Sequence, residues 1–166
     1  MNGGDIVTMD RYSDFELQLQ VRLTTGANSG VKYYVTEQET GNKGSAIGPE
    51  FQILDDNNHP DALLGAVPGS RTFGSLYDLI PTGKKRVNGI GQWNTIRIVS
   101  KDKHVEHWLN GFKLFEYERG SEEFRNLVAG SKFKNRPGFG EAEDGHILLQ
   151  DHGNEVSFRN IKIKPL

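Results

Sequence analysis

Three polar residues in one short stretch are of the types that perform acid–base chemistry or bind sugars. Glu50 and Gln52 are two apart, Phe51 and Ile53 alternate with them, and Asp55 follows just past the end of this expected strand. In a strand, residues i and i+2 share a face, so Glu50 and Gln52 are expected on the same side. Such a face can bind sugar hydroxyls or position a general acid and base. A solvated outer face shows the same pattern, so spacing alone leaves both interpretations open.

Two histidines lie in another alternating stretch. His104 and His107 are three apart, so in a strand they point to opposite faces and cannot form a metal-binding pair. His107 shares its face with Val105, whereas Trp108 shares the other with Glu106, so either His107 or Trp108 must be partly buried. An imidazole titrates near neutral pH and suits a general base, and a buried structural histidine is the alternative.

A third polar cluster, Gln150-Asp151-His152-Gly153, closes an expected strand. An aspartate can orient a histidine, but neighbours in a strand diverge, so this pairing requires a turn; an Asx turn with an exposed histidine is the alternative. The oxygen-rich residues 55–59 could hold Ca²⁺, but they lack the spacing of a calcium-binding loop, so we predict an ordinary turn. The chain contains neither a Gly-x-Ser-x-Gly elbow nor a phosphate loop.

The elements that must position these residues are mostly strands. Residues 15–23 alternate apolar and polar side chains over nine positions, which indicates a half-buried strand. Asn110-Gly111 predicts a tight hairpin. Further strands are predicted over 31–35, 50–54, 74–79, 93–100, 104–109, 112–117, 146–150 and 156–163. One helix is predicted over 121–133 with Ser121 as its cap, a helical turn near 61–64, and loops over 24–30, 37–48, 55–70, 81–91 and 137–145.

Composition supports the same fold class. The chain has 166 residues, 20 of them glycine, which suits strands joined by tight turns in one domain. We predict an all-β, two-sheet antiparallel sandwich or jelly roll with one short helix. The 20 basic and 22 acidic residues give no electrostatic reason to expect nucleic acid or an anionic membrane as a partner. Without cysteine, disulfides and thiolate metal sites are excluded. We see neither a membrane span nor, in residues 1–10, a signal peptide.

Eight segments occur in an order that resembles the 3-keto-disaccharide hydrolase domain family, a group of concanavalin- or laminarinase-like jelly rolls found in bacteria of the Bacteroides type. The segments are Phe15-Glu16-Leu17, Gly26–Gly30, Pro49–Asp55, Leu76-Tyr77-Asp78, Gln92-Trp93-Asn94, His107–Gly111, Gly145–Gly153 and Phe158–Ile161. The resemblance implies one such domain over residues 1–166, without the strands that usually precede the Phe15 block. It also implies a periplasmic or extracellular location.

The chemistry implied by the resemblance starts from a sugar with a ketone at C3. The ketone acidifies the C2 proton, a base removes it, the C1–oxygen bond breaks, and water adds back. This requires a base, a donor to the enolate oxygen and an acid for the leaving group. Laminarinases carry Glu-x-Asp-x-x-Glu, whereas this chain has Glu50-x-Gln52-x-x-Asp55, so their pair of carboxylates is not reproduced.

On this resemblance, we expect Glu50 and His107 to be the catalytic acid–base pair. The residues expected to line or support the pocket are Asn28, Ser29, Gln52, Asp55, Trp108, Gln150, Asp151, His152 and Arg159. Asn28-Ser29-Gly30 could equally be a turn, and Arg159 a tie for the last strand. No metal is required by the sequence; a divalent ion could take the role of the enolate donor, with His107, His152, Glu50 and Asp55 as candidate ligands.

A function of another class fits the same fold. A non-catalytic carbohydrate-binding module would use aromatic platforms, for which Tyr33, Tyr34, Tyr77 and Trp108 are the candidates. An adhesion or protein-binding sandwich is a third option. A pocket in which Glu50 and His107 converge would favour the enzyme, and an exposed aromatic groove the binding module. In either case the expected partner is a carbohydrate; the oligomeric state is not predicted.

Overall fold

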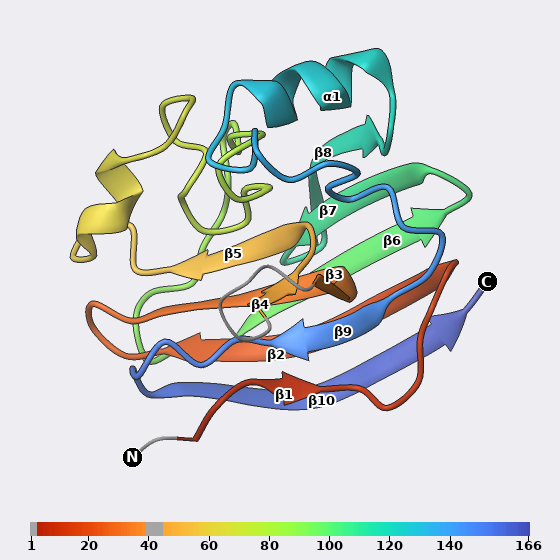
Figure 1. Ribbon diagram of the computed structural model, residues 1–166. Coiled ribbons are helices and arrows are strands. Elements are labelled where there is room, and N and C mark those ends of the chain that lie inside the picture. The colour runs from red at the N-terminus through yellow and green to blue at the C-terminus, as the bar shows by residue number, and fades with distance from the viewer. Residues whose placement is uncertain (1–2, 39–44) are drawn as a thin grey trace.

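The computed structural model describes residues 3–38 and 45–166, where two antiparallel sheets form a sandwich (Figure 1). One sheet contains β1 (Ile6–Val7), β9 (His146–Leu149), β3 (Asn28–Gln38) and β4 (Ser45–Ile47), with β5 (Glu50–Leu54) also paired to β3. The other contains β10 (Val156–Pro165), β2 (Phe15–Leu23), β6 (Asn94–Lys101), β7 (His104–Leu109) and β8 (Phe112–Glu118). Helix α1 (Glu122–Ala129) lies beyond β8, and a 3₁₀ turn spans Pro60–Leu63. The predicted all-β jelly-roll sandwich with one short helix is confirmed.

The strand with the clearest sequence pattern is also the most regular. In β2 every second side chain, from Phe15 to Leu23, is buried between the sheets, and the intervening ones face outward. The strand pairs with β10 on one side and β6 on the other. The β7–β8 hairpin turns at Asn110 and Gly111, both with positive φ, as the Asn-Gly pair predicts.

Several predicted boundaries are corrected. Residues 28–30 belong to β3 rather than to a turn; the positive φ of +69° lies at Gly26. The predicted loop 37–48 contains the end of β3 and all of β4, and residues 39–44 lie outside the described residues. The helix is shorter than predicted, although Ser121 does cap it by accepting a hydrogen bond from Phe124 N at 3.1 Å.

The strand predicted over 74–79 is absent. Gly74 and Asp78 have φ values of +89° and +64°, which turn the chain, and only Leu76 forms isolated bridges. This segment instead closes the outer edge of β5. Tyr77 N donates to the carbonyl of Glu50 at 3.0 Å, and Gly74 N donates to that of Gln52 at 2.8 Å. The edge is therefore protected from pairing with another chain.

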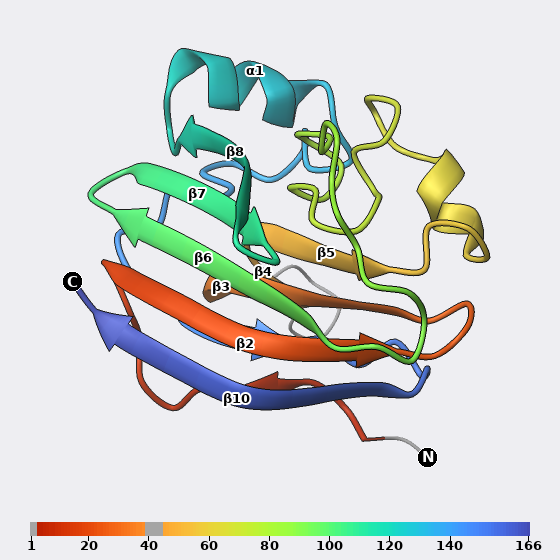
Figure 2. The same cartoon turned by 180° about the vertical axis from the view of Figure 1, so that it is seen from behind.

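Two segments distant in sequence come together beside β5: the connection from β5 to β6 and the stretch after α1 (Figures 1 and 2). The buried carboxylate of Asp78 joins them. It accepts hydrogen bonds from Arg71 Nε at 2.8 Å, Ala66 N at 3.1 Å and Lys132 N at 2.8 Å. Burial alone would raise the pKa of Asp78, but these donors outweigh it and lower the pKa. Asp78 is thus a charged anchor for the chain that covers β5.

The described residues contain no helix with the length and hydropathy of a membrane span.

Candidate functional site

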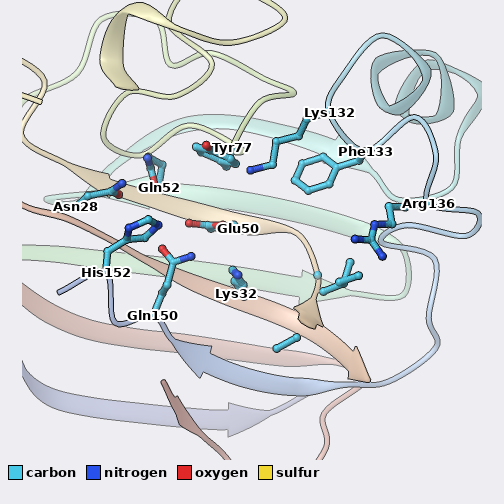
Figure 3. Close-up of a pocket in the computed structure, with 13 residues that line it drawn as sticks. Asn28, Lys32, Glu50, Gln52, Tyr77, Lys132, Phe133, Arg136, Gln150 and His152 are labelled. Atoms are coloured by element: carbon cyan, nitrogen blue, oxygen red, sulfur yellow. The ribbon is translucent and has the colours of Figure 1, made fainter. Parts of the chain in front are cut away.

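A cavity of about 270 Å³ opens where the covering segments meet β3, β5 and the end of β9 (Figure 3). It lies on the face of β3 and β5 opposite to the core, because Tyr33 and Phe51 point the other way, between the sheets. The lining residues are Asn28, Lys32, Ala46, Ile47, Gly48, Glu50, Gln52, Tyr77, Lys132, Phe133, Arg136, Gln150 and His152.

Glu50 lies in the middle of this cavity (Figure 3). Its side chain is only 6% exposed. Burial raises its pKa from 4.5 to about 7, and the nearby ammonium groups of Lys32 and Lys132 partly oppose that rise. Among the described residues no ion pair engages Glu50. A carboxyl group that titrates near neutral pH in a cavity is suited to proton transfer.

Gly30 makes room for this carboxyl group. A Cβ on Gly30 would lie 2.1 Å from Oε1 of Glu50 and 2.8 Å from its Cδ. No side chain larger than hydrogen fits without moving Glu50. The glycine is required here by close approach and not by a positive φ.

We expect Gly30→Ala to displace the Glu50 carboxylate. For any reaction in which Glu50 transfers a proton, kcat/KM should then fall about 10²-fold, the scale of effect for a group misplaced by about 1 Å. Gly83→Ala is the matched control, because a Cβ at Gly83 meets nothing within 4 Å. Steady-state kinetics across pH measure both the rate and the pKa of Glu50. An alanine at position 30 that left the rate and the pH profile of the wild type intact would contradict this role for the glycine.

Amide groups gather at one end of the cavity. Figure 3 shows Asn28, Gln52, Gln150 and His152 on the side towards which the Glu50 carboxylate points. Gln52 is 1% exposed, and both its amide nitrogen and its oxygen lack a hydrogen-bond partner among the described residues, as does Oδ1 of Asn28. Buried polar atoms are rarely left unpaired in proteins. These three atoms therefore indicate room for a polar ligand.

Tyr77 and Lys132 approach Glu50 from the covering segments (Figure 3). The ammonium of Lys132 lies 4.2 Å from the centre of the Tyr77 ring, and Asp78 holds the Lys132 backbone. Burial raises the pKa of Tyr77, so its phenol keeps its proton, and burial lowers that of Lys132. The surroundings of Glu50 thus combine two cationic side chains with a protonated phenol.

His107 does not belong to this site. It is fully buried between the sheets, with its ring 4.7 Å from that of Phe51. Nδ1 lies 3.1 Å from the carbonyl of Gly74, which can only accept, so Nε2 accepts from the hydroxyl of Tyr33 at 2.8 Å. Burial lowers the pKa of His107 to about 3. The prediction that Glu50 and His107 converge is wrong, because packing against the other sheet places His107 inside and Trp108 outside.

Two other predicted residues support the site without lining it. Ser29 is buried, and its hydroxyl donates to the carbonyl of Gln150 at 2.7 Å, which positions that residue. Asp55 accepts hydrogen bonds from Gly26 N and Asn58 Nδ2, both at 2.8 Å, so its carboxylate stabilises a turn. This is the ordinary turn expected for residues 55–59.

The remaining three predicted residues lie elsewhere. Trp108 is on the outer face of the second sheet, with Arg97 4.1 Å above its ring. Arg159 stacks on Trp93 at 3.9 Å and ties the last strand to its neighbours. Asp151 accepts from Gly153 N at 2.8 Å, the Asx turn that was the alternative interpretation.

The four candidate metal ligands do not form one group. Glu50 and His152 line the cavity, His107 is in the core, and the Asp55 carboxylate is occupied by the turn. These four candidate ligands therefore do not come together in one metal site.

In the described ranges, a set of three metal-compatible side chains occurs on the second sheet: His104, Glu106 and Glu116. Lys113 already contacts both of its carboxylates. This cluster is a surface ion-pair network, remote from the cavity.

Four basic or aromatic lining residues were not predicted from the sequence: the basic side chains of Lys32, Lys132 and Arg136, and the aromatic ring of Phe133. Lys132 and Phe133 fell in the predicted helix, and Arg136 fell between that helix and the next predicted loop. Lys32 alternates with Val31 and Tyr33 in β3, so parity could have placed it on the same face as Asn28. No pattern in the neighbouring sequence predicts that Lys132, Phe133 and Arg136 line the cavity.

Comparison with known proteins yields related domains. A family model described as 3-keto-alpha-glucoside-1,2-lyase-like domain matches residues 1–164. A Bacteroides thetaiotaomicron protein named 3-keto-disaccharide hydrolase is 34% identical over 184 residues; the match covers 99% of this chain and 63% of that protein. This chain thus spans less than two thirds of that relative.

Solved structures agree. A candidate glycosyl hydrolase from Parabacteroides distasonis, whose crystal structure is known, is 35% identical in sequence to this chain, with a TM-score of 0.86. The match covers 98% of this chain and 76% of the hydrolase chain. The carbohydrate-binding module CBM66 from Bacillus subtilis matches at 9% identity, with a TM-score of 0.54 over 97% of this chain and 82% of that one, and shows a shared fold alone.

Proposed function

This chain belongs to the 3-keto-alpha-glucoside-1,2-lyase-like domain family, and on that premise we propose that its cavity cleaves glycosides whose sugar carries a ketone at C3. The observation that carries the proposal is Glu50, a buried carboxyl group with a pKa of about 7 beside unpartnered amides. Family membership also supports a carbohydrate as the partner and a periplasmic or extracellular location.

The proposed reaction begins with proton transfer. The C3 ketone acidifies the C2–H bond, the Glu50 carboxylate takes the proton, and the bonding electrons move into the enolate. The C1–oxygen bond then breaks with its electron pair on the leaving oxygen, which leaves a double bond between C1 and C2. The proton on Glu50 is returned to that oxygen, so one residue serves as base and then as acid. Water adds across the double bond, with hydroxyl at C1 and hydrogen at C2, to give the free 3-oxo sugar.

The surroundings of Glu50 suit each step. A base is most effective when its pKa is near the working pH. The positive charges of Lys32 and Lys132 stabilise the negative charge of the enolate. The unpartnered amides of Asn28 and Gln52 bind the sugar hydroxyls. The acid–base roles first expected to be shared by Glu50 and His107 thus both fall to Glu50 in this proposal.

The geometry gives little support to a purely binding module with aromatic platforms. Tyr33 and Tyr34 are core residues, and Trp108 lies on the other sheet beneath Arg97. Of the four candidate platforms, Tyr77 lines the cavity. Two aromatic rings, Tyr77 and Phe133, line the cavity beside the buried carboxyl group of Glu50. A buried carboxyl group that titrates near neutral pH supports a reaction site more than a sugar-binding platform.

The test is incubation with 3-keto-trehalose, 3-keto-lactose and the two parent disaccharides, with product sugars measured by chromatography. We expect cleavage of the 3-keto sugars and none of the parents, because without the ketone the C2 proton is not acidic. Parallel reactions with EDTA measure any dependence on a divalent ion. Binding of the 3-keto sugars without cleavage, with and without added metal, would contradict the proposal and favour a binding module.

A further inference from the structure

The reaction proposed above makes no use of Arg136. Its guanidinium lines the cavity at the end opposite to Asn28 and Gln52 (Figure 3). Its Nη1 is buried and has no hydrogen-bond partner among the described residues. An unpaired buried guanidinium nitrogen is costly, because the charge has lost water without gaining an acceptor. This end of the cavity is therefore suited to an anion.

The net charge of the residues that line the cavity also favours an anionic ligand. Leaving His152 aside, its charged lining residues are Lys32, Lys132 and Arg136 against Glu50 alone. Because the pKa of Glu50 is about 7, near neutral pH that single negative charge is present only part of the time. The chain as a whole carries −2, so the cavity is a positive site on a slightly negative protein. Such contrast attracts anionic ligands.

The orientation of Glu50 places the parts of the substrate. Its carboxylate points towards the amide end, so the sugar that loses its C2 proton lies there (Figure 3). The leaving group must then extend towards Arg136. Phe133 and Ile47 also line the cavity and supply apolar surface that sugar hydroxyls do not need. Phe133 is held by stacking on Phe139, with ring centroids 4.0 Å apart.

Resting on the proposed function, we infer that the Arg136 end is a leaving-group subsite that selects a carboxylate. A guanidinium offers a planar pair of N–H donors that matches the two oxygens of a carboxylate. Phe133 and Ile47 pack against an aromatic ring. The preferred leaving group is therefore an aromatic acid linked to the sugar through a phenolic oxygen; a uronic acid would offer the same carboxylate without the ring.

The experiment compares charged and neutral leaving groups. The substrates are the 3-oxo-glucosides of 4-hydroxybenzoate and of 4-hydroxybenzamide, and 3-oxo-glucosyl disaccharides ending in glucuronate or in glucose. For the wild type we expect kcat/KM to be about 10- to 100-fold higher for each acid than for its neutral partner, the range of one charge-assisted hydrogen-bonded contact. Arg136→Gln should abolish that preference. Lys134→Gln, an exposed change outside the cavity, should leave it intact.

A binding measurement separates this inference from the proposed reaction. Calorimetric titration with free 4-hydroxybenzoate and 4-hydroxybenzamide needs no turnover. Tighter binding of the acid that disappears in Arg136→Gln supports the subsite even if no 3-oxo-glycoside is cleaved, in which case only the proposed reaction fails. If the wild type binds and cleaves the acid and the amide equally well, the proposed carboxylate subsite is wrong. The proposed reaction would still be supported in that case, because the 3-oxo-glycosides are cleaved. If glucuronate is preferred over glucose as strongly as 4-hydroxybenzoate is preferred over its amide, the subsite recognises the carboxylate alone and not the aromatic ring.

Discussion

Glu50→Gln is expected to lower kcat/KM for a 3-oxo-glycoside about 10²- to 10⁴-fold, the usual contribution of a positioned general base. The amide has nearly the same shape but cannot accept the C2 proton. In the wild type, kcat/KM should rise with pH and level off above a pKa of about 7, because the proposed base, Glu50, can accept a proton only when it is ionised. The residual rate of the variant should lack that rise.

The same substitution should stabilise the protein at alkaline pH. The folded-state pKa of Glu50, about 7, lies above its ordinary value of 4.5, so the folded protein keeps a proton that the unfolded chain releases between these values. The free energy of unfolding of the wild type therefore falls as pH rises through that window. The loss amounts to about 3 kcal/mol above pH 7, at about 1.4 kcal/mol for each pKa unit. A glutamine at position 50 does not ionise, so the variant does not lose this stability at high pH.

Kinetics at several pH values and denaturant unfolding at pH 4 and pH 9 measure both effects. We expect the Glu50→Gln variant and the wild type to be similar in stability at pH 4 and the variant to be more stable at pH 9. Glu123→Gln, an exposed change in the first turn of α1, is the matched control and should alter neither quantity appreciably. Full activity in Glu50→Gln would remove Glu50 from the chemistry, whatever its effect on stability.

Asp78→Ala is expected to reduce the free energy of unfolding by about 3 to 5 kcal/mol, the cost of breaking a buried charged pair. The side chain of Asp78 is 1% exposed and accepts from Arg71 and from two backbone N–H groups. Its loss leaves those donors unpaired and releases the backbone of Lys132. The half-exposed ion pair of Arg11 and Asp144 provides the control, and Asp144→Ala should cost less than about 1 kcal/mol.

The pH dependence identifies the charge of Asp78 as the cause. Its folded-state pKa is lowered, so its stabilising contribution is present above its ordinary pKa and is lost as pH falls through the folded value. The difference between wild type and Asp78→Ala should be constant from pH 5 to pH 8 and shrink below pH 4. Denaturant titrations measure it. A difference that stayed the same in acid would assign the cost to lost packing instead.

The elements most readily predicted from sequence were those with local patterns. Alternation from Phe15 to Leu23 predicted β2, and Asn110-Gly111 predicted the β7–β8 hairpin, because strand parity and turn geometry depend on a few neighbouring residues. Glu50 and Gln52 were placed on one face for the same reason. That this face is buried could not be seen, because the segments that cover it are distant in sequence.

The errors also have physical reasons. Parity showed that His107 and Trp108 point to opposite sides, but the packing of the other sheet decides which side is inside. Residues 74–79 looked like a strand, yet positive φ at Gly74 and Asp78 turns the chain, and the buried carboxylate of Asp78 anchors that turn. Arg136 lies in a stretch without periodicity, so its place in the cavity is settled only by tertiary contacts.

The origins of the cavity residues have an evolutionary consequence. Glu50 and the glycine that accommodates it are fixed in paired strands, whereas Lys132, Phe133 and Arg136 come from a connection after α1. Insertions and substitutions accumulate more freely in connections than in sheets. On the proposed function, descendants of one ancestral domain can therefore exchange the group proposed to recognise the leaving group and inherit unchanged the carboxylate proposed to transfer the proton. Diversification of substrates within such a lineage requires no reinvention of the chemistry.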